Sequence, residues 1–245
     1  MLNSQNESRR QEIESNLEKV RQRMNVALEG RSQARLVAVS KLKPTSDILY
    51  AYEAGQRHFG ENYVQELVEK SKELPLDIKW HFIGSLQTNK CKMLAAIPNL
   101  WVVETISSVK SAEAMNNACA SRESPLKVFV QVNTSGEESK SGVSPDECIP
   151  LVKYIRENCE NLDFSGIMTI GALGHDTATD GLNPDFIKLK NIHQQNIEEF
   201  SVNADPTNAP LEMSMGMSED FEEALRLGST NVRVGSAIFG ERLKN

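Results

Sequence analysis

The sequence predicts an α/β protein of the (β/α)8 type, a TIM barrel preceded by one extra helix. Three observations support this prediction. Short β-rich runs alternate with amphipathic helical patterns, the runs number eight, and a length of 245 residues is usual for such a barrel. Alternation of this kind requires parallel strands with helical crossovers, and eight units fit a closed barrel better than an open sheet.

The first element is a helix that precedes the barrel. Between about Gln11 and Leu28 the apolar residues recur every three or four positions, which is the period of a helix with one buried face. These residues are Ile13, Leu17, Val20, Met24 and Leu28. We expect the barrel itself to follow, from about residue 36 to residue 245.

Eight strands are expected, each a short run rich in β-branched and aromatic residues. They cover Leu36–Ser40, Arg57–Gly60, Trp80–Gly84, Leu100–Glu104, Lys127–Val132, Asp163–Thr169, Leu211–Ser214 and Asn231–Val234. Helical patterns separate them. They cover Asp47–Ala54, Tyr63–Glu73, Asn89–Ala96, Val109–Ser121, Pro145–Asn158, Asp185–Phe200, Glu219–Leu227 and a short last helix from Ala237.

No feature of the sequence divides the chain. It contains no linker rich in Pro, Gly or Ser, no internal repeat and no low-complexity tract, so we expect a single domain over residues 1–245. Two longer polar loops, residues 133–142 and 171–184, follow the fifth and sixth predicted strands. We expect both at the end of the barrel where active sites form.

Composition and charge exclude several classes of protein. The content of 39% hydrophobic and 25% charged residues is that of an ordinary soluble protein. A formal net charge of −7 without a basic block argues against nucleic-acid binding. The polar N-terminus and the lack of a long apolar run predict a cytoplasmic protein without a membrane segment.

The four cysteines point to neither a disulfide framework nor a zinc site. They are widely spaced and form no Cys-x-x-Cys pair, so we expect them to be reduced and structural, and we expect no metal. They are Cys91, Cys119, Cys148 and Cys159.

The first predicted strand ends on Lys41, where an ordinary core strand would end on a turn residue. Lys41 is in register with Val37 and Val39, so all three side chains are expected on one face of the strand. Partial burial lowers the pKa of a lysine, and the neutral amine can attack a carbonyl carbon to form a Schiff base. The alternative is a surface lysine of the following loop, an interpretation that also suits Lys43.

Glycines and serines follow the last two predicted strands. Ser214, Gly216 and Ser218 come after the seventh strand, and Gly235 and Ser236 open the last helix. In these barrels the same two loops and a helix N-terminus commonly bind phosphate through backbone N–H and hydroxyl groups. The alternative is that Ser218 and Ser236 are helix N-caps. Because both loops carry the pattern, we favour the phosphate site.

Arg233 lies between Val232 and Val234, so its side chain points to the opposite face of the last strand. If the valines pack on the helices, the guanidinium lies inside the barrel, where a permanent charge needs a partner. That partner is either an internal carboxylate, Glu61 or Glu104, or a ligand atom. An amine nucleophile, a phosphate site and an inward arginine together suit an aldehyde that carries a phosphate, and pyridoxal 5′-phosphate (PLP) is the obvious candidate.

Other polar residues near this end have ordinary structural roles available. Asn62 could cap the second barrel helix as easily as contact a ligand. We expect His81 to be a hydrogen-bonded core histidine, Met215 and Met217 to pack, and Lys140 to be a solvated charge.

Seven blocks of sequence, in one order, resemble those of a known family. They are "AVSKLKP", "FGENYVQE", "WHFIGSLQTNK", "VQVNTSGEESKSG", "GIMTIG", "SMGMSEDFEEAL" and "GSTNVRVGSAIFG". Over about Leu36 to Gly240 the chain is similar to the pyridoxal phosphate homeostasis proteins, the YggS/PROSC family. The resemblance implies a barrel similar to the N-terminal domain of alanine racemase, which is PLP fold type III, with PLP held as a Schiff base.

The resemblance also assigns roles to two charged residues. By motif, Lys41 is the Schiff-base lysine and Arg233 is the partner of the pyridine nitrogen. An arginine at that position keeps the ring nitrogen unprotonated, which weakens the electron sink that most PLP chemistry needs.

Further contacts are implied by the same motifs. Ser214, Gly235 and Ser236 would contact the phosphate, and Asn62 would lie beside the cofactor ring. The family implies a PLP-binding protein of intracellular PLP homeostasis, with PLP-dependent apoenzymes as candidate partners. A monomer is the expected oligomeric state.

Three functions compete for this site: a PLP carrier without catalysis, an amino-acid racemase or decarboxylase, and a Schiff-base aldolase for a sugar phosphate. A racemase of this fold needs a second acid–base residue, a tyrosine, and a C-terminal β domain. An aldolase gives Arg233 no ring nitrogen to bind. We favour the carrier because all four tyrosines fall in predicted helices: Tyr50, Tyr52, Tyr63 and Tyr154.

Overall fold

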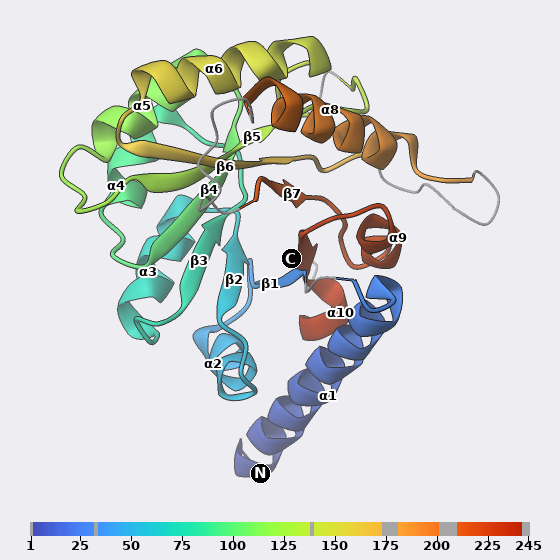
Figure 1. The fold of residues 1–245 in the computed structure, drawn as a ribbon. Coiled ribbons are helices and arrows are strands. Elements are labelled where there is room, and N and C mark those ends of the chain that lie inside the picture. Colours follow the sequence, from blue (N-terminus) through green and yellow to red (C-terminus); the bar gives the residue numbers. More distant parts are fainter. Residues whose placement is uncertain (1, 32–33, 138–139, 173–180, 201–209, 242–245) are drawn as a thin grey trace.

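The computed structural model describes residues 2–31, 34–137, 140–172, 181–200 and 210–241 of the chain. In this part of the chain, eight parallel strands close into a barrel in the order β1 to β8 (Figure 1). The predicted fold class is confirmed, and each strand lies within two residues of its predicted ends. The strands are β1 (Arg35–Val39), β2 (His58–Glu61), β3 (Lys79–Phe82), β4 (Leu100–Ile106), β5 (Leu126–Gln131), β6 (Leu162–Met168), β7 (Glu212–Ser214) and β8 (Asn231–Val234).

Helices surround the barrel, and in the described part of the chain at least one follows each strand (Figure 1). Two helices that the sequence predicts as continuous begin with a short 3-10 turn, η1 (Thr88–Lys90) before α4 and η2 (Pro145–Glu147) before α6. The α-helices are α1 (Leu2–Leu28), α2 (Thr45–Glu53), α3 (Val64–Glu73), α4 (Cys91–Ala95), α5 (Val109–Ala118), α6 (Cys148–Asn158), α8 (Pro184–Phe200), α9 (Phe221–Arg226) and α10 (Ser236–Phe239).

The leading helix α1 begins at Leu2, nine residues before its predicted start at Gln11. The first turns contain no apolar stripe, which is why the hydrophobic period does not find them. They are held instead by polar contacts, since Arg9 Nη2 donates to Asp47 Oδ2 (2.6 Å) and to the Phe239 carbonyl (2.8 Å). The helix packs against α2, α9 and α10, and so joins the first and last helices of the barrel (Figure 1).

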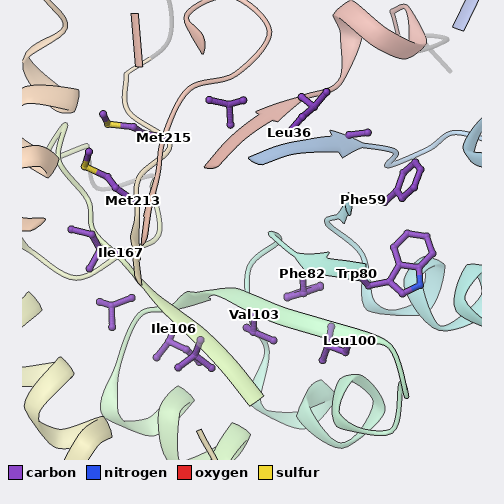
Figure 2. Packing of buried hydrophobic residues seen from close by; sticks show 14 of the residues in the cluster. Leu36, Phe59, Trp80, Phe82, Leu100, Val103, Ile106, Ile167, Met213 and Met215 are labelled. Atoms are coloured by element: carbon purple, nitrogen blue, oxygen red, sulfur yellow. The ribbon is translucent and has the colours of Figure 1, made fainter. Parts of the chain in front are cut away.

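The hydrophobic core lies mainly between the strands and the surrounding helices. Alternate strand residues, among them Phe59, Trp80 and Val103, point outward into this layer and are fully buried. Figure 2 labels residues of this packing from β1, β2, β3, β4, β6 and β7, together with Met215, which follows β7. The interior of the barrel is less apolar than this layer. It holds buried polar side chains beside a small apolar group that contains Phe129 and Met168.

The barrel closes unevenly on the two sides of β8. On one side β8 pairs with β1 at four positions, which include Val37 with Arg233. On the other side β7 and β8 share the single pair Ser214 and Asn231. Register partners point to the same side of a sheet, so Arg233 and Val37 both point into the barrel, as predicted.

All four cysteines are free and buried, as expected. No helix in the described ranges is long and apolar enough to cross a membrane. Among the residues that the structure describes, no group of three His, Cys, Asp or Glu side chains is placed to hold a metal ion.

Candidate functional site

A cavity of about 320 Å³ opens at the C-terminal ends of the strands. Five of the six residues predicted to bind a ligand line it, namely Lys41, Asn62, Arg233, Gly235 and Ser236. The sequence reasoning did not identify its apolar wall, which comes from three strands or the residues that follow them. That wall is formed by Val39, Ile83, Met168 and Ile170.

Lys41 lies at the end of β1, in a turn over residues 40–43 that the Lys43 N–H closes by donating to the Ser40 carbonyl (3.1 Å). Lys41 lines the cavity together with Val39, the last residue of β1. The next residue, Leu42, has φ of 61°, a left-handed conformation that side chains with a Cβ rarely adopt. The amine is therefore presented by a tight and unusual turn.

Arg233 is 4% exposed and lies at the base of the cavity. Its Nη1 donates to Ser214 Oγ (2.5 Å) and its Nη2 to the Thr169 carbonyl (2.7 Å). Burial lowers the pKa of this guanidinium, whereas the charges of Glu104 and Asp220 raise it. These two bonds engage two of the five N–H donors of an arginine, so the group can still donate to a ligand.

The counterion of Arg233 is Glu104, one of the two carboxylates predicted for that role. Glu104 Oε2 accepts a hydrogen bond from Ser214 Oγ (2.6 Å), and Oε1 accepts from Asn231 Nδ2 (2.9 Å). Burial acts to raise its pKa, but the bond from His81 and the charges around it hold the pKa of Glu104 below its ordinary value. Glu104 is thus an ionised carboxylate inside the barrel, linked to the guanidinium through Ser214.

Two histidines continue this buried network toward the N-terminal end of the barrel. His81 Nδ1 lies 2.6 Å from Glu104 Oε1, and His81 Nε2 lies 2.9 Å from His58 Nδ1. Burial lowers the pKa of His81 and lowers that of His58 to about 2, so both imidazoles are neutral. A neutral His81 that donates from Nδ1 accepts at Nε2 from His58. The prediction of a hydrogen-bonded core histidine is confirmed.

Ser214 lies elsewhere than the phosphate role requires. It is fully buried inside the barrel, bonded to Glu104 and Arg233, and it does not line the cavity. The end of β7 explains this placement. The strand ends at Ser214, below the cavity, and the chain reaches the cavity only at Met217 and Ser218. Met215 packs in the core as expected, whereas Met217 lines the cavity.

Asn62 does not cap the helix that follows it. The N-cap of α3 is Tyr63, without a side-chain cap bond, so the capping alternative is wrong. Asn62 Oδ1 is buried and, among the described residues, has no hydrogen-bond partner. A buried acceptor left unpaired costs about 1–3 kcal/mol. Asn62 lines the cavity, which leaves this acceptor next to the space that a ligand would fill.

Gly84 allows the close approach that positions Asn62. A Cβ on Gly84 would lie 1.9 Å from the Asn62 carbonyl oxygen, so any other residue there would displace this part of the wall. Gly235 is similarly close to β1, because a Cβ there would lie 3.2 Å from the Val39 carbonyl.

The serines after β7 and β8 are not caps of their own helices. The N-caps of α9 and α10 are Asp220 and Gly235, both without side-chain cap bonds, so the N-cap alternative for Ser218 and Ser236 is wrong. Ser218 Oγ instead accepts from the N–H groups of Gly235 (3.2 Å) and Ala237 (3.4 Å). One hydroxyl oxygen thus lies where these backbone donors converge at the cavity wall.

Two lysines differ from their predicted roles as solvated charges. Lys43 lines the cavity, and its Nζ donates to the carbonyls of Phe239 (3.0 Å) and Gly240 (3.1 Å) at the end of α10. Lys140 Nζ donates to Glu137 Oε1 (2.6 Å) and to the Gly171 carbonyl (2.7 Å), which connects the two long loops. Residues 138–139 and 173–180 of these loops lie outside the described residues.

None of the four tyrosines, all of them described, lines the cavity. Three of them lie within helices, as predicted. Tyr63 is the exception to its prediction, because it precedes α3 and is 52% exposed. It follows Asn62 but is not among the residues that line the cavity.

Glu61, the other carboxylate proposed for Arg233, points away from the cavity and pairs with Lys70 of α3 (2.7 Å). Burial is the main reason that the pKa of Glu61 is raised from its ordinary value of 4.5 to about 7, and Lys70 opposes the shift. The folded protein therefore holds this proton more tightly than the unfolded chain does.

The raised pKa of Glu61 predicts a loss of stability with rising pH. Its contribution is complete below pH 4.5 and disappears as the pH rises through about 7, which is up to about 3 kcal/mol at 1.36 kcal/mol per pKa unit. Glu61→Gln removes the titrating group but keeps its shape. Urea unfolding at several pH values from 5 to 8 should show a smaller decrease for this variant than for the parent protein. Parallel curves would show that Glu61 does not titrate in this range.

Comparison with known proteins gives one consistent result. Residues 9–243 match the family model for the alanine racemase N-terminal domain. A human protein named pyridoxal phosphate homeostasis protein is 52% identical over 217 residues, which cover 86% of this chain and 77% of that protein. A protein of the same name from Schizosaccharomyces pombe is 44% identical over 230 residues, covering 94% of this chain and 93% of the relative.

A solved structure agrees with these relatives. PipY from Synechococcus elongatus, determined with PLP bound, superimposes with a TM-score of 0.75 at 30% sequence identity. The match covers 93% of this chain and 100% of PipY. The similarity therefore includes the strands and loops that build the cavity.

Proposed function

This chain belongs to the pyridoxal phosphate homeostasis protein family, and from that premise we propose that it binds PLP in the cavity at the C-terminal end of the barrel. We propose further that it holds PLP as a Schiff base on Lys41 and buffers or delivers the cofactor without catalysis. The observation that carries the proposal is the convergence of Lys41, Asn62, Arg233 and the start of α10 on one cavity of about 320 Å³.

The residues present fit this cofactor. When bound, PLP supplies an aldehyde that condenses with an amine, a ring nitrogen and a phosphate group. Lys41 supplies the amine, and Asn62 Oδ1 is an acceptor without a partner among the described residues. Gly235 and Ser236 are the proposed phosphate contacts. Ser214 does not line the cavity, and we propose Ser218, which does, as a hydroxyl donor in its place.

Arg233 supports a binding role more than a catalytic one. Its buried charge is balanced by ionised Glu104, so the guanidinium stays protonated and offers only donors to a ring nitrogen. A ring nitrogen that accepts a hydrogen bond from Arg233 stays unprotonated and withdraws electrons weakly. Carbanion chemistry at this site would be poorly supported.

The racemase alternative is kept open by the family domain, which takes its description from alanine racemase. A racemase needs two acid–base groups on opposite sides of the reacting carbon. All four tyrosines are among the described residues, and none lines the cavity. This supports the carrier over the racemase.

The finer points of the proposal extend beyond the cavity. We propose that the chain acts in the cytoplasm as a monomer built from one domain over residues 1–245, and that PLP-dependent apoenzymes receive the cofactor. The homeostasis name of the relatives supports transfer to other proteins, because a supply of PLP is useful only to enzymes that bind it.

Borohydride trapping followed by peptide mapping tests the proposed function. Purified protein incubated with PLP should be yellow, and reduction should leave one stable pyridoxyl group on Lys41. Incubation of the loaded protein with a panel of amino acids should give no turnover above that of free PLP. A pyridoxyl group on another lysine, or racemisation at enzyme-like rates of about 1 s⁻¹ or faster, would contradict the proposal.

A further inference from the structure

The turn that carries Lys41 is held from outside the barrel by three ionisable side chains, which we call the Lys70 cluster (Glu61, Glu66 and Lys70). Lys70 Nζ donates to Glu61 Oε1 (2.7 Å) and to Glu66 Oε1 (2.6 Å). The side chains of Lys70 and Glu61 are 6% and 0% exposed, so the cluster is largely removed from water. A buried charge cluster needs a reason beyond stability, because such groups are costly to desolvate.

The cluster contacts the backbone on both sides of Lys41. Lys70 Nζ also donates to the Ser40 carbonyl (2.8 Å), which precedes Lys41. The Leu42 N–H, which follows Lys41, donates to Glu66 Oε1 (2.7 Å). The peptide group before Lys41 is therefore bonded to Lys70, and the one after it is bonded to Glu66.

Leu42 shows why this turn needs support. Its φ of 61° is disfavoured for a residue with a Cβ, and its side chain is 60% exposed, so packing does little to hold it. A glycine would adopt this conformation at no steric cost. With leucine at this position, the hydrogen bond that the Leu42 N–H donates to Glu66 and the one that Lys70 donates to the Ser40 carbonyl hold the conformation.

Resting on the proposed function, we propose that Lys70 is a positioning residue for Lys41, which it holds through the Ser40 carbonyl and, with Glu66, through the Leu42 N–H. The Lys41 Nζ must reach the aldehyde carbon for the C–N bond to form, and the aldehyde oxygen then leaves as water. A displacement of about 1 Å in such a reacting group can slow a reaction by roughly a hundredfold. Lys70 is not among the residues that line the cavity, so the proposed effect on the amine passes through the turn.

The experiment separates positioning of the amine from binding of the cofactor. We compare the parent protein with Lys70→Met, Glu66→Ala and the double variant Lys70→Met with Leu42→Gly. Lys153→Met, an exposed lysine on α6, is the matched control. For each protein we measure the rate of covalent attachment at saturating PLP by timed borohydride trapping. We also measure the affinity for pyridoxine 5′-phosphate, which carries an alcohol in place of the aldehyde.

We expect Lys70→Met to slow attachment by about tenfold to a hundredfold and Glu66→Ala to slow it by less. Affinity for pyridoxine 5′-phosphate should stay within about twofold of the parent value, because the phosphate and ring contacts do not involve Lys70. Leu42→Gly should restore most of the rate in the double variant. Such a rescue is expected of a positioning role and not of a general loss of structure.

Two results would overturn the inference. One is an unchanged attachment rate in both single variants. The other is an equal loss of rate and pyridoxine 5′-phosphate affinity that Leu42→Gly does not restore. If Lys70→Met fails to fold, Glu66→Ala with and without Leu42→Gly decides the question, since Glu66 is 20% exposed and its loss is better tolerated. Failure of the parent protein itself to be trapped on Lys41 would instead overturn the proposed function.

Discussion

Lys41→Ala should abolish borohydride-stable attachment of PLP, reducing the trapped fraction to the background of free lysines. The alanine removes the cavity-lining amine that follows β1, and the other lining lysine, Lys43, donates to carbonyls at the end of α10. Contacts from Arg233 and the start of α10 remain. PLP should therefore still bind, with an affinity lower by at least about tenfold, or about 1.4 kcal/mol.

The measurement combines mass spectrometry after reduction with equilibrium dialysis of PLP. Lys153→Ala serves as the control, because this lysine of α6 is 61% exposed and should leave both readouts unchanged. Equal trapping in Lys41→Ala and the parent protein would assign the attachment to another residue. A complete loss of PLP binding would show that the covalent bond, and not the rest of the cavity, holds the cofactor.

Glu104→Ala should destabilise the protein by about 3–5 kcal/mol, the cost of leaving a buried charge without its counterion. Glu104 is fully buried and accepts hydrogen bonds from Ser214, Asn231 and His81. Its removal leaves these donors unpaired and takes away the buried carboxylate that is linked to Arg233 through Ser214. The free energy of unfolding from urea titrations at pH 7 measures the loss.

A double-mutant cycle with Arg233→Met separates the charge effect from the lost hydrogen bonds. Removing the cation should reduce the cost of Glu104→Ala by at least about 1 kcal/mol, because no uncompensated charge then remains in the barrel. Glu104→Gln, which keeps the shape and one acceptor, should fall between the parent and the alanine variant. Additive losses in the cycle would mean that Glu104 does not act as the counterion of Arg233.

The barrel was predictable because each of its units repeats one pattern. Parallel strands buried on both faces read as short continuous apolar runs, and helices with one buried face show a period of three to four residues, so both patterns are visible without tertiary information. The start of α1 was not predictable in this way, since its first turns depend on the contacts of Arg9 with Asp47 and Phe239. Those partners lie far from Arg9 in the sequence.

The site was predictable where the backbone decides the placement. Strand alternation sends Arg233 into the barrel, and Lys41 follows directly after β1, so the structure brings both to one cavity. It also sends Ser214 inward, but the depth at which a side chain lies depends on where each strand ends, and β7 is only three residues long. Sequence spacing does not report that depth.

Long side chains were the hardest to predict. Lys43, Lys70 and Lys140 each find carbonyl or carboxylate partners from other elements, and a flexible four-carbon stem can reach many such positions. The buried pair of Glu61 and Lys70 leaves a weak signal in the sequence, a helical residue at an apolar position. That signal alone does not reveal which backbone groups the pair contacts.

Closure of the barrel pairs its first strand with its last, which brings Lys41, just after β1, and Arg233, within β8, to the same cavity. Contacts between such distant parts of a chain form slowly and late in folding. The pocket therefore exists only once the cylinder is complete, and a ligand that binds there stabilises the finished fold by mass action. Binding of PLP would therefore also report that a newly made chain has folded.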